Sequence, residues 1–156
     1  MLRIKHISEE GKELDVIRNL FREYEKELDE DICFQKFEEE VKDPLKKYGT
    51  PTGDLLIAYW NNVAAGCIAL TNLNDDGVCE MKRLYVRPAF RKNKIGRILI
   101  EKLIASAKSK GYTKMRLDSL FKLESAIRLY QDFGFENISA YYDNPLEGVV
   151  YMEKEL

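Results

Sequence analysis

A short run of basic residues is the feature of this sequence that most directly indicates chemistry. Its members precede or begin a predicted helix, and they are Arg91, Lys92, Lys94 and Arg97. A helix N-terminus already carries about half a positive charge and normally attracts acidic residues, yet no acid follows here until Glu101. Gly96 lies inside the run, where its missing side chain would let an anion approach the backbone N–H groups. Two interpretations stay open: a solvated basic loop, or a cradle for a phosphate group.

The neighbouring sequence places this run between a strand and a helix. Residues 84–86 are mostly aromatic or branched, as strands prefer, and Pro88 ends the strand because it lacks an N–H group. From Ile95 onward apolar residues recur at helical spacing: Ile95, Ile98, Leu99, Leu103, Ile104 and Ala107. A strand, a tight turn and a glycine-containing helix start favour the phosphate cradle.

The composition is that of an ordinary globular domain. The chain has 156 residues, of which 33% are charged and 45% hydrophobic, and this suits one domain over residues 1–156. A net charge of −2 and no extended basic stripe disfavour nucleic-acid binding, so any positive site must be local. No apolar run approaches the roughly 20 residues of a membrane span, and the first residues lack the apolar core of a signal peptide. We therefore expect a cytoplasmic protein that binds no membrane.

The cysteines and the histidine give little support for metal or disulfide chemistry. Cys33, Cys67 and Cys79 are odd in number and follow no metal-ligand spacing. We expect them to be reduced, buried thiols. Because His6 is the only histidine, zinc sites and histidine-based catalytic triads are nearly excluded.

Periodicity and turn residues predict the order of the remaining elements. A strand opens the chain, two helices follow it, and residues 45–54 form a loop that is either a plain connection or a rim of the substrate site. Tight turns at Asn61–Asn62 and Asn74–Gly77 join three antiparallel strands that lead to the basic run. Gly111 ends the central helix, and the next strand lies parallel to residues 78–86. The predicted helices span residues 12–29, 34–42, 95–107 and 124–133, and the predicted strands span residues 2–7, 55–60, 63–70, 78–86, 114–118, 136–142 and 149–153.

Two stretches resemble motifs of the GNAT N-acetyltransferase family. Residues 91–96 are similar to its acyl-CoA-binding motif, Q/R-x-x-G-x-G/A, with Lys94 in place of the middle glycine. Residues 125–135 are similar to its A-I-x-L-Y-x-x-x-G-F stretch, with Leu123 where an asparagine is common. The motifs follow the family's order, and the resemblance covers nearly the whole chain. It implies the α/β fold of acyl-CoA N-acyltransferases: a central mixed, mostly antiparallel sheet of about six or seven strands, flanked by about four helices.

The resemblance implies an enzyme that transfers an acetyl group directly from acetyl-CoA to a primary amine of a small molecule or peptide, without a metal. The backbone N–H groups of residues 92–97 would bind the pyrophosphate, with Arg91 and Lys92 as charge partners. The edge of residues 84–86 would bind the pantetheine amides as an added strand does, and this strand would part from residues 114–118 to admit the thioester. The implied cofactor-binding residues are Leu84, Tyr85, Val86, Arg91, Lys92, Asn93, Lys94, Ile95, Gly96 and Arg97.

The resemblance also suggests two catalytic residues. Glu80 matches the strand glutamate that takes a proton from the amine in several family members; the alternatives are a carboxylate paired with Lys82 or Arg83, and a water relay in place of the base. Tyr130 matches the tyrosine that gives a proton to the departing thiolate. Its alternative interpretation is a core tyrosine with a satisfied hydroxyl group.

The acceptor is less well defined than the donor. Five acidic residues near the end of the first helix either favour a cationic acceptor or form a solvated helix face: Glu23, Glu27, Asp29, Glu30 and Asp31. Residues 141–145 either line the acceptor side or form a contact in a homodimer. A non-catalytic acyl-CoA-binding or regulatory module on the same fold is an alternative function. Nucleotide binding is disfavoured, because neither G-x-x-x-x-G-K-[ST] nor a complete G-x-G-x-x-G is present.

Overall fold

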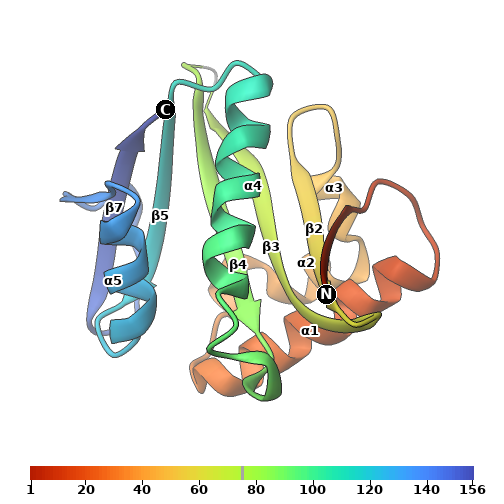
Figure 1. Cartoon of the computed structure of the whole chain (residues 1–156). Coiled ribbons are helices and arrows are strands. Elements are labelled where there is room, and N and C mark those ends of the chain that lie inside the picture. The colour runs from red at the N-terminus through yellow and green to blue at the C-terminus, as the bar shows by residue number, and fades with distance from the viewer. Residues whose placement is uncertain (75) are drawn as a thin grey trace.

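The computed structural model describes residues 1–74 and 76–156, and its centre is a mixed seven-stranded sheet with helices on both faces (Figure 1). The order across the sheet is β1-β2-β3-β4-β5-β7-β6, and β4 and β5 are parallel while the other neighbouring pairs are antiparallel. This confirms the mixed, mostly antiparallel sheet expected from the sequence. The strands are β1 (Leu2–His6), β2 (Asp54–Trp60), β3 (Val63–Asn74), β4 (Val78–Val86), β5 (Lys114–Leu120), β6 (Glu136–Ile138) and β7 (Val149–Glu155).

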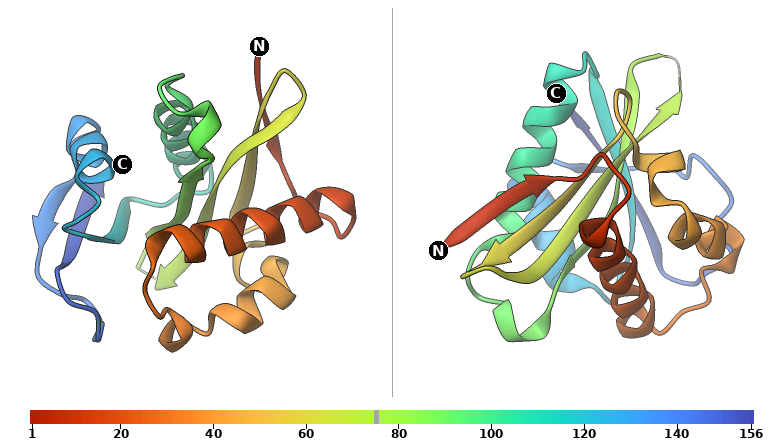
Figure 2. Two further views of the ribbon diagram at one scale, coloured as in Figure 1. Left: turned by 90° about the horizontal axis from the view of Figure 1, so that it is seen from below. Right: turned by 90° about the vertical axis from the view of Figure 1, so that its right-hand side faces the viewer.

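The helices divide between the two faces of the sheet. Seen from below, the N-terminal helices lie on one side and the two later ones on the other (Figure 2). The N-terminal helices are α1 (Lys12–Leu28), α2 (Phe37–Lys42) and α3 (Pro44–Tyr48); the later ones are α4 (Ile95–Ser109) and α5 (Glu124–Asp132). Short 3₁₀ turns occur at Cys33–Gln35 and Pro88–Phe90.

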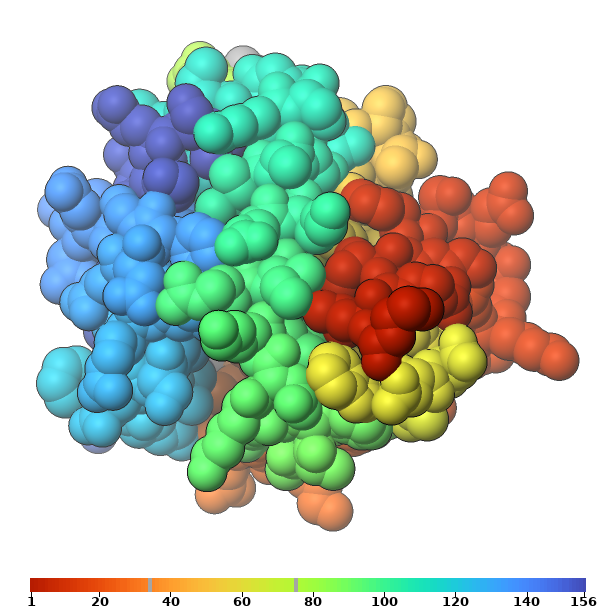
Figure 3. Space-filling view, viewed as in Figure 1, coloured from red at the N-terminus to blue at the C-terminus, as the bar shows by residue number. Residues whose placement is uncertain are grey.

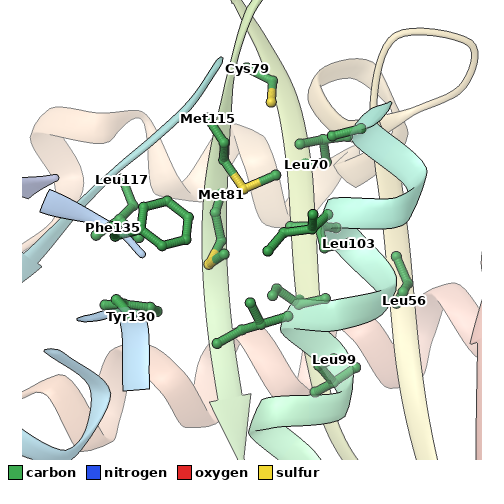
Figure 4. Close-up of a cluster of buried hydrophobic side chains, with 14 of the residues drawn as sticks. Leu56, Leu70, Cys79, Met81, Leu99, Leu103, Met115, Leu117, Tyr130 and Phe135 are labelled. Carbon is green, nitrogen blue, oxygen red and sulfur yellow. The ribbon is translucent and has the colours of Figure 1, made fainter. Parts of the chain in front are cut away.

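Each face of the sheet has its own hydrophobic core. On the α1 face, Leu14, Ile17 and Phe21 are fully or almost fully buried together with Leu55 and Ile57 of β2. On the other face, side chains of α4 such as Leu99 and Leu103 pack with those of β2, β3 and β4, and Tyr130 and Phe135 extend this core toward α5 (Figure 4). Neighbouring residues of a strand point to opposite faces, so central strands covered on both sides are apolar at nearly every position. This accounts for the continuous apolar run of β2.

Several predicted turns are confirmed by the backbone. Asn61 and Asn62 have φ of 48° and 69°, the left-handed values that a tight hairpin needs. Gly111, with φ of 89°, follows the end of α4 as a glycine terminator does. The predicted turn at residues 74–77 includes Asp75, which lies outside the described residues.

The structure corrects the prediction for residues 34–54. A single helix over 34–42 and a loop over 45–54 were expected, but a 3₁₀ turn precedes α2, and Pro44 begins a separate helix, α3. A proline suits the first position of a helix, since the N–H group that it lacks would have no partner there. The described chain therefore has five α-helices rather than about four.

Two smaller predictions are also wrong. The strand expected over residues 136–142 ends at Ile138, because the chain then turns so that Tyr141 and Tyr142 pack against Tyr151 of β7. All three cysteines are free thiols, but Cys33 is exposed rather than buried. Among the described helices, none is long and apolar enough to cross a membrane, and the cytoplasmic location stays a prediction.

Candidate active site

The parallel strands β4 and β5 part in the middle of the sheet. Their pairing runs from Val78–Lys114 to Glu80–Arg116 and then stops, while β4 continues beside β3 and β5 beside β7. The gap between the two ribbons widens beyond this point (Figure 1). A cleft occupies it, lined by residues 81–84 of β4, residues 117–120 of β5 and side chains from both helical layers. The parting implied by the resemblance is confirmed.

A β-bulge shapes the β4 side of the cleft. Cys67 pairs with Tyr85 and Ala69 with Lys82, so two residues of β4, Arg83 and Leu84, lie opposite one residue of β3. Arg83 has φ of 60°, an unusual value for a residue with a long side chain. The sequence contains no turn-forming residue here that would have predicted the bulge.

A buried ion pair holds Arg83 in this conformation. Its Nε lies 2.7 Å and its Nη2 3.0 Å from the two carboxylate oxygens of Glu40 on α2, and both side chains are only 2% exposed. The guanidinium also lies over the rings of Tyr24 and Phe37. Burial opposes ionisation of Glu40, but the hydrogen bond and charge of Arg83 keep the pKa of this carboxyl below its ordinary value. The bulge is therefore tied to the α1–α3 layer by a satisfied charge pair.

Glu80 lies where the two strands part and is almost fully buried. Its Oε2 accepts a hydrogen bond of 2.6 Å from the hydroxyl of Tyr141, and its Oε1 lies 3.8 Å from Nζ of Lys82. Both burial and the nearby negative charge of Glu80 raise the pKa of Tyr141. The ion pair with Lys82 is one of the partnerships considered for Glu80, whereas Arg83 pairs with Glu40 instead. The contact of Tyr141 could not be read from the sequence, because 61 positions separate the two residues.

Tyr130 reaches the cleft from the face of the sheet that α4 and α5 cover, opposite the α1–α3 layer. Its ring packs edge-on against Phe135, with 6.0 Å between ring centroids, and the residue is buried at the cleft (Figure 4). Burial raises the pKa of its hydroxyl group. No partner for this hydroxyl is found in the described part of the chain. The interpretation of Tyr130 as a core residue with a satisfied hydroxyl is thus only half right: the ring belongs to the core, but the hydroxyl has no partner in the chain as described.

Asp118 on β5 is a cleft residue that the sequence did not single out. Its Oδ2 is buried and lacks a hydrogen-bond partner in the described chain. Burial raises the pKa of this carboxyl, and the positive charge of Lys82 opposes the shift in part. Polar and apolar residues alternate over residues 114–118, so Asp118 resembles the other polar positions of the strand and no sequence signal distinguishes it.

The basic run near α4 has acidic partners that are distant in sequence. Arg91 donates to both carboxylate oxygens of Glu27 at 2.6 Å, Arg87 binds Glu23, and Arg97 binds Asp132. The sequence places no acid next to the run, but the fold brings Glu27 to Arg91 and Asp132 to Arg97. Glu23 and Glu27 of α1 are therefore partly exposed carboxylates paired with arginines, and a role of the acidic group in acceptor binding stays a prediction. In the described chain, Lys92 and Lys94 form no ion pair.

The backbone of the same loop presents a series of N–H groups. Lys92 and Lys94 have φ of 72° and 60°, so Lys94 adopts the left-handed conformation that the motif's glycine normally provides. Among the described residues, no acceptor pairs with the N–H groups of residues 92–97. A side-chain carbon added at Gly96 would meet Leu129 of α5 at 3.5 Å, an ordinary contact. The loop that precedes α4 and the helix α5 lie side by side in the space-filling view (Figure 3).

The edge of β4 that faces the cleft is open. Tyr85 and Val86 pair with Cys67 and Gly66 of β3, and no strand of the described chain pairs with their other side. An open edge of this kind can bind an extended amide-containing ligand. The described residues contain no group of three or more His, Cys, Asp or Glu side chains that could hold a metal ion.

Comparisons with known proteins agree with this architecture. The sequence model described as the acetyltransferase (GNAT) family matches residues 14–135. An uncharacterized N-acetyltransferase of Schizosaccharomyces pombe is 42% identical, over 93% of this chain and 90% of that protein. The chain therefore belongs to the GNAT acetyltransferase family.

Solved structures share the fold. A GNAT-family acetyltransferase of Staphylococcus aureus superposes with a TM-score of 0.79 at 21% identity, covering 98% of this chain and 99% of that one. The PaiA N-acetyltransferase of Thermoplasma acidophilum, solved in complex with coenzyme A, gives a TM-score of 0.71 at 18% identity, with 99% of each chain covered. At these identities the likeness concerns the fold alone.

Proposed function

We propose that this protein transfers an acetyl group from acetyl-CoA directly to a primary amine of a small molecule or peptide. The observation that carries the proposal is the cleft where β4 and β5 part, which is lined in part by Tyr130. Membership of the acetyltransferase family supports the class of reaction.

The donor's phosphates would lie on the N–H groups of residues 92–97. These groups have no acceptor within the described part of the chain, and a helix N-terminus attracts negative charge. Lys92 and Lys94 carry charges free to pair with phosphate, while Arg91 would have to share its guanidinium with Glu27. The open edge of residues 84–86 would bind the pantetheine amides. The neighbour solved with coenzyme A supports this assignment by its fold.

The chemistry needs one proton acceptor and one proton donor. The acceptor amine arrives mainly as an ammonium ion and loses a proton before it attacks, and we assign this proton to Glu80, directly or through the hydroxyl of Tyr141. The carbon–nitrogen bond forms, the carbon–sulfur bond breaks, and the nitrogen gives up its second proton. Tyr130 supplies a proton to the thiolate and regains one from solvent. The products are an amide, free CoA and one released proton.

Turnover with a conservative tyrosine variant tests this assignment. Purified protein would be incubated with acetyl-CoA and a panel of amines, polyamines, amino acids and peptides, and release of the free thiol would be followed. Because removal of a general acid costs about 10²–10⁴ in rate, Tyr130→Phe should lower kcat by at least about a hundredfold while the Kd for acetyl-CoA stays the same. Tyr112→Phe is the matched control, since the Tyr112 hydroxyl bonds to Thr52 outside the cleft.

Two outcomes would contradict the proposal. Unchanged kcat in a folded Tyr130→Phe protein would show that Tyr130 is not the proton donor. Tight acetyl-CoA binding without thiol release from any amine would favour the non-catalytic acyl-CoA-binding module.

A further inference from the structure

The carboxylates in and around the cleft differ in whether they have a direct partner. Glu40 pairs with Arg83, and Glu80 pairs with Lys82, so these two carboxylates have cationic partners. Asp118 also lines the cleft, yet it forms no hydrogen bond or ion pair within the described residues, and its Oδ2 is buried. A buried polar atom without a partner costs about 1–3 kcal/mol and is rare in native proteins. A carboxylate in this state suggests that its partner arrives with a substrate.

We propose that Asp118 binds the acceptor as an alkylammonium ion inside the cleft. The inference rests on the proposed function, because it identifies the acceptor of that reaction by its charge. Asp118 lies on β5 two positions beyond Arg116, the last residue that pairs with β4, so it flanks the opening through which the thioester and the amine would meet. Tyr130 lines the same cleft from α5.

Charged and titratable groups from several elements surround Asp118. They are Tyr24 of α1, Lys47 of α3, Glu80, Lys82 and Arg83 of β4, Tyr130 of α5, Tyr141, and Tyr151 of β7. The cations Lys47, Lys82 and Arg83 equal the carboxylates Glu40, Glu80 and Asp118 in number, but their ion pairs within the described residues are with Glu40 and Glu80. An ammonium ion would give the Asp118 carboxylate a direct partner, whereas an acidic acceptor would be repelled by it.

This assignment selects a class of acceptor. Alkyl primary amines have pKa values near that of lysine, about 10, and are cationic at neutral pH. Arylamines are neutral there and would gain nothing from an unpaired carboxylate. The protein should therefore prefer alkyl primary amines, and the preference should reside in KM for the amine because Asp118 binds rather than transfers the proton.

The test compares Asp118→Asn with the wild-type protein. A hydrogen bond to a charged group contributes about 1.5–3 kcal/mol, so KM for an alkylamine should rise about 10- to 100-fold while KM for acetyl-CoA is unchanged. The preference for alkylamines over arylamines should be lost, and Asp118→Glu should restore part of it. Asp15→Asn, on the exposed side of α1, is the matched control.

A binding measurement separates this inference from the proposed function. Butylammonium chloride would be titrated into the protein by calorimetry without acetyl-CoA, and its Kd should rise at least about tenfold in Asp118→Asn. Binding with this dependence but no thiol release would overturn the acetyltransferase and keep the ammonium site. An equal Kd in both proteins, or a wild-type preference for arylamines, would overturn the ammonium site whatever the turnover.

Discussion

Glu40 and Asp118 are carboxylates of the same central region with opposite surroundings. Glu40 is held by two short hydrogen bonds from Arg83, and this contact fixes the β4 bulge. Asp118, across the cleft on β5, has a buried oxygen without a hydrogen-bond partner among the described residues. The ion pair of Glu40 with Arg83 anchors β4 to the α1–α3 layer. On the β5 side, the Asp118 carboxylate has no such cation in contact with it among the described residues. We infer that the first carboxylate serves the fold and the second serves the ligand.

The largest expected effect comes from breaking the completed pair. Glu40→Gln leaves the buried charge of Arg83 without its counter-charge, and loss of one partner of a buried pair costs about 3–5 kcal/mol. Denaturant unfolding should therefore show a free energy of unfolding lower by this amount. Glu38→Gln, which removes an exposed carboxylate paired with Arg22, is the control and should change stability by less than about 1 kcal/mol. A loss below 1 kcal/mol in Glu40→Gln as well would contradict the structural role given to this pair.

At Asp118 we expect the reverse: removing the charge should increase stability at neutral pH. Its pKa is raised in the folded protein, so below the unfolded pKa of about 3.9 both states are protonated and the carboxyl costs nothing. As the pH rises from the unfolded pKa through the folded pKa, this carboxyl ionises more readily in the unfolded chain than in the folded protein. The free energy of unfolding of the wild-type protein therefore falls. Asp118→Asn has no such loss. Its thermal midpoint should match the wild type in acid and exceed it at pH 7, by an amount corresponding to about 1 kcal/mol.

A variant that is less stable than the wild type at pH 7 would show that Asp118 has a stabilising partner in the folded protein. In that case the contrast with Glu40 disappears, and so does the argument for an ammonium site. Thermal unfolding followed from acid to neutral pH distinguishes the two results directly.

Local sequence signals predicted much of the fold. The helical spacing from Ile95, the paired asparagines at 61–62 and Gly111 each determine structure within a few residues, and the structure has α4, the hairpin and the helix end at these positions. The two motif stretches placed the chain in its family. Predicted turns gave the antiparallel order β2-β3-β4, and the helical crossover gave β5 parallel to β4, whereas the position of β7 between β5 and β6 was not predicted.

The charge arrangement of the cleft could not be predicted in the same way. The partners of Arg87 and Arg91 on α1 lie 64 positions earlier in the chain, and Glu40 lies 43 positions before Arg83. The left-handed backbone of Arg83 arises from this distant pair rather than from a turn residue. Asp118 stands out only once every other charge near the cleft has been assigned a partner.

Amide hydrogen exchange with and without coenzyme A tests the central claim most directly, since the claim is that the ligand lies across the loop and the open edge of β4. Among the residues that the structure describes, the N–H groups of residues 92–97 have no acceptor, so they should exchange rapidly in the free protein and slow by at least about tenfold when coenzyme A binds. The amides of β1 and β2 should be unaffected. Binding of coenzyme A that leaves residues 92–97 unprotected, or protects a different region, would contradict the account.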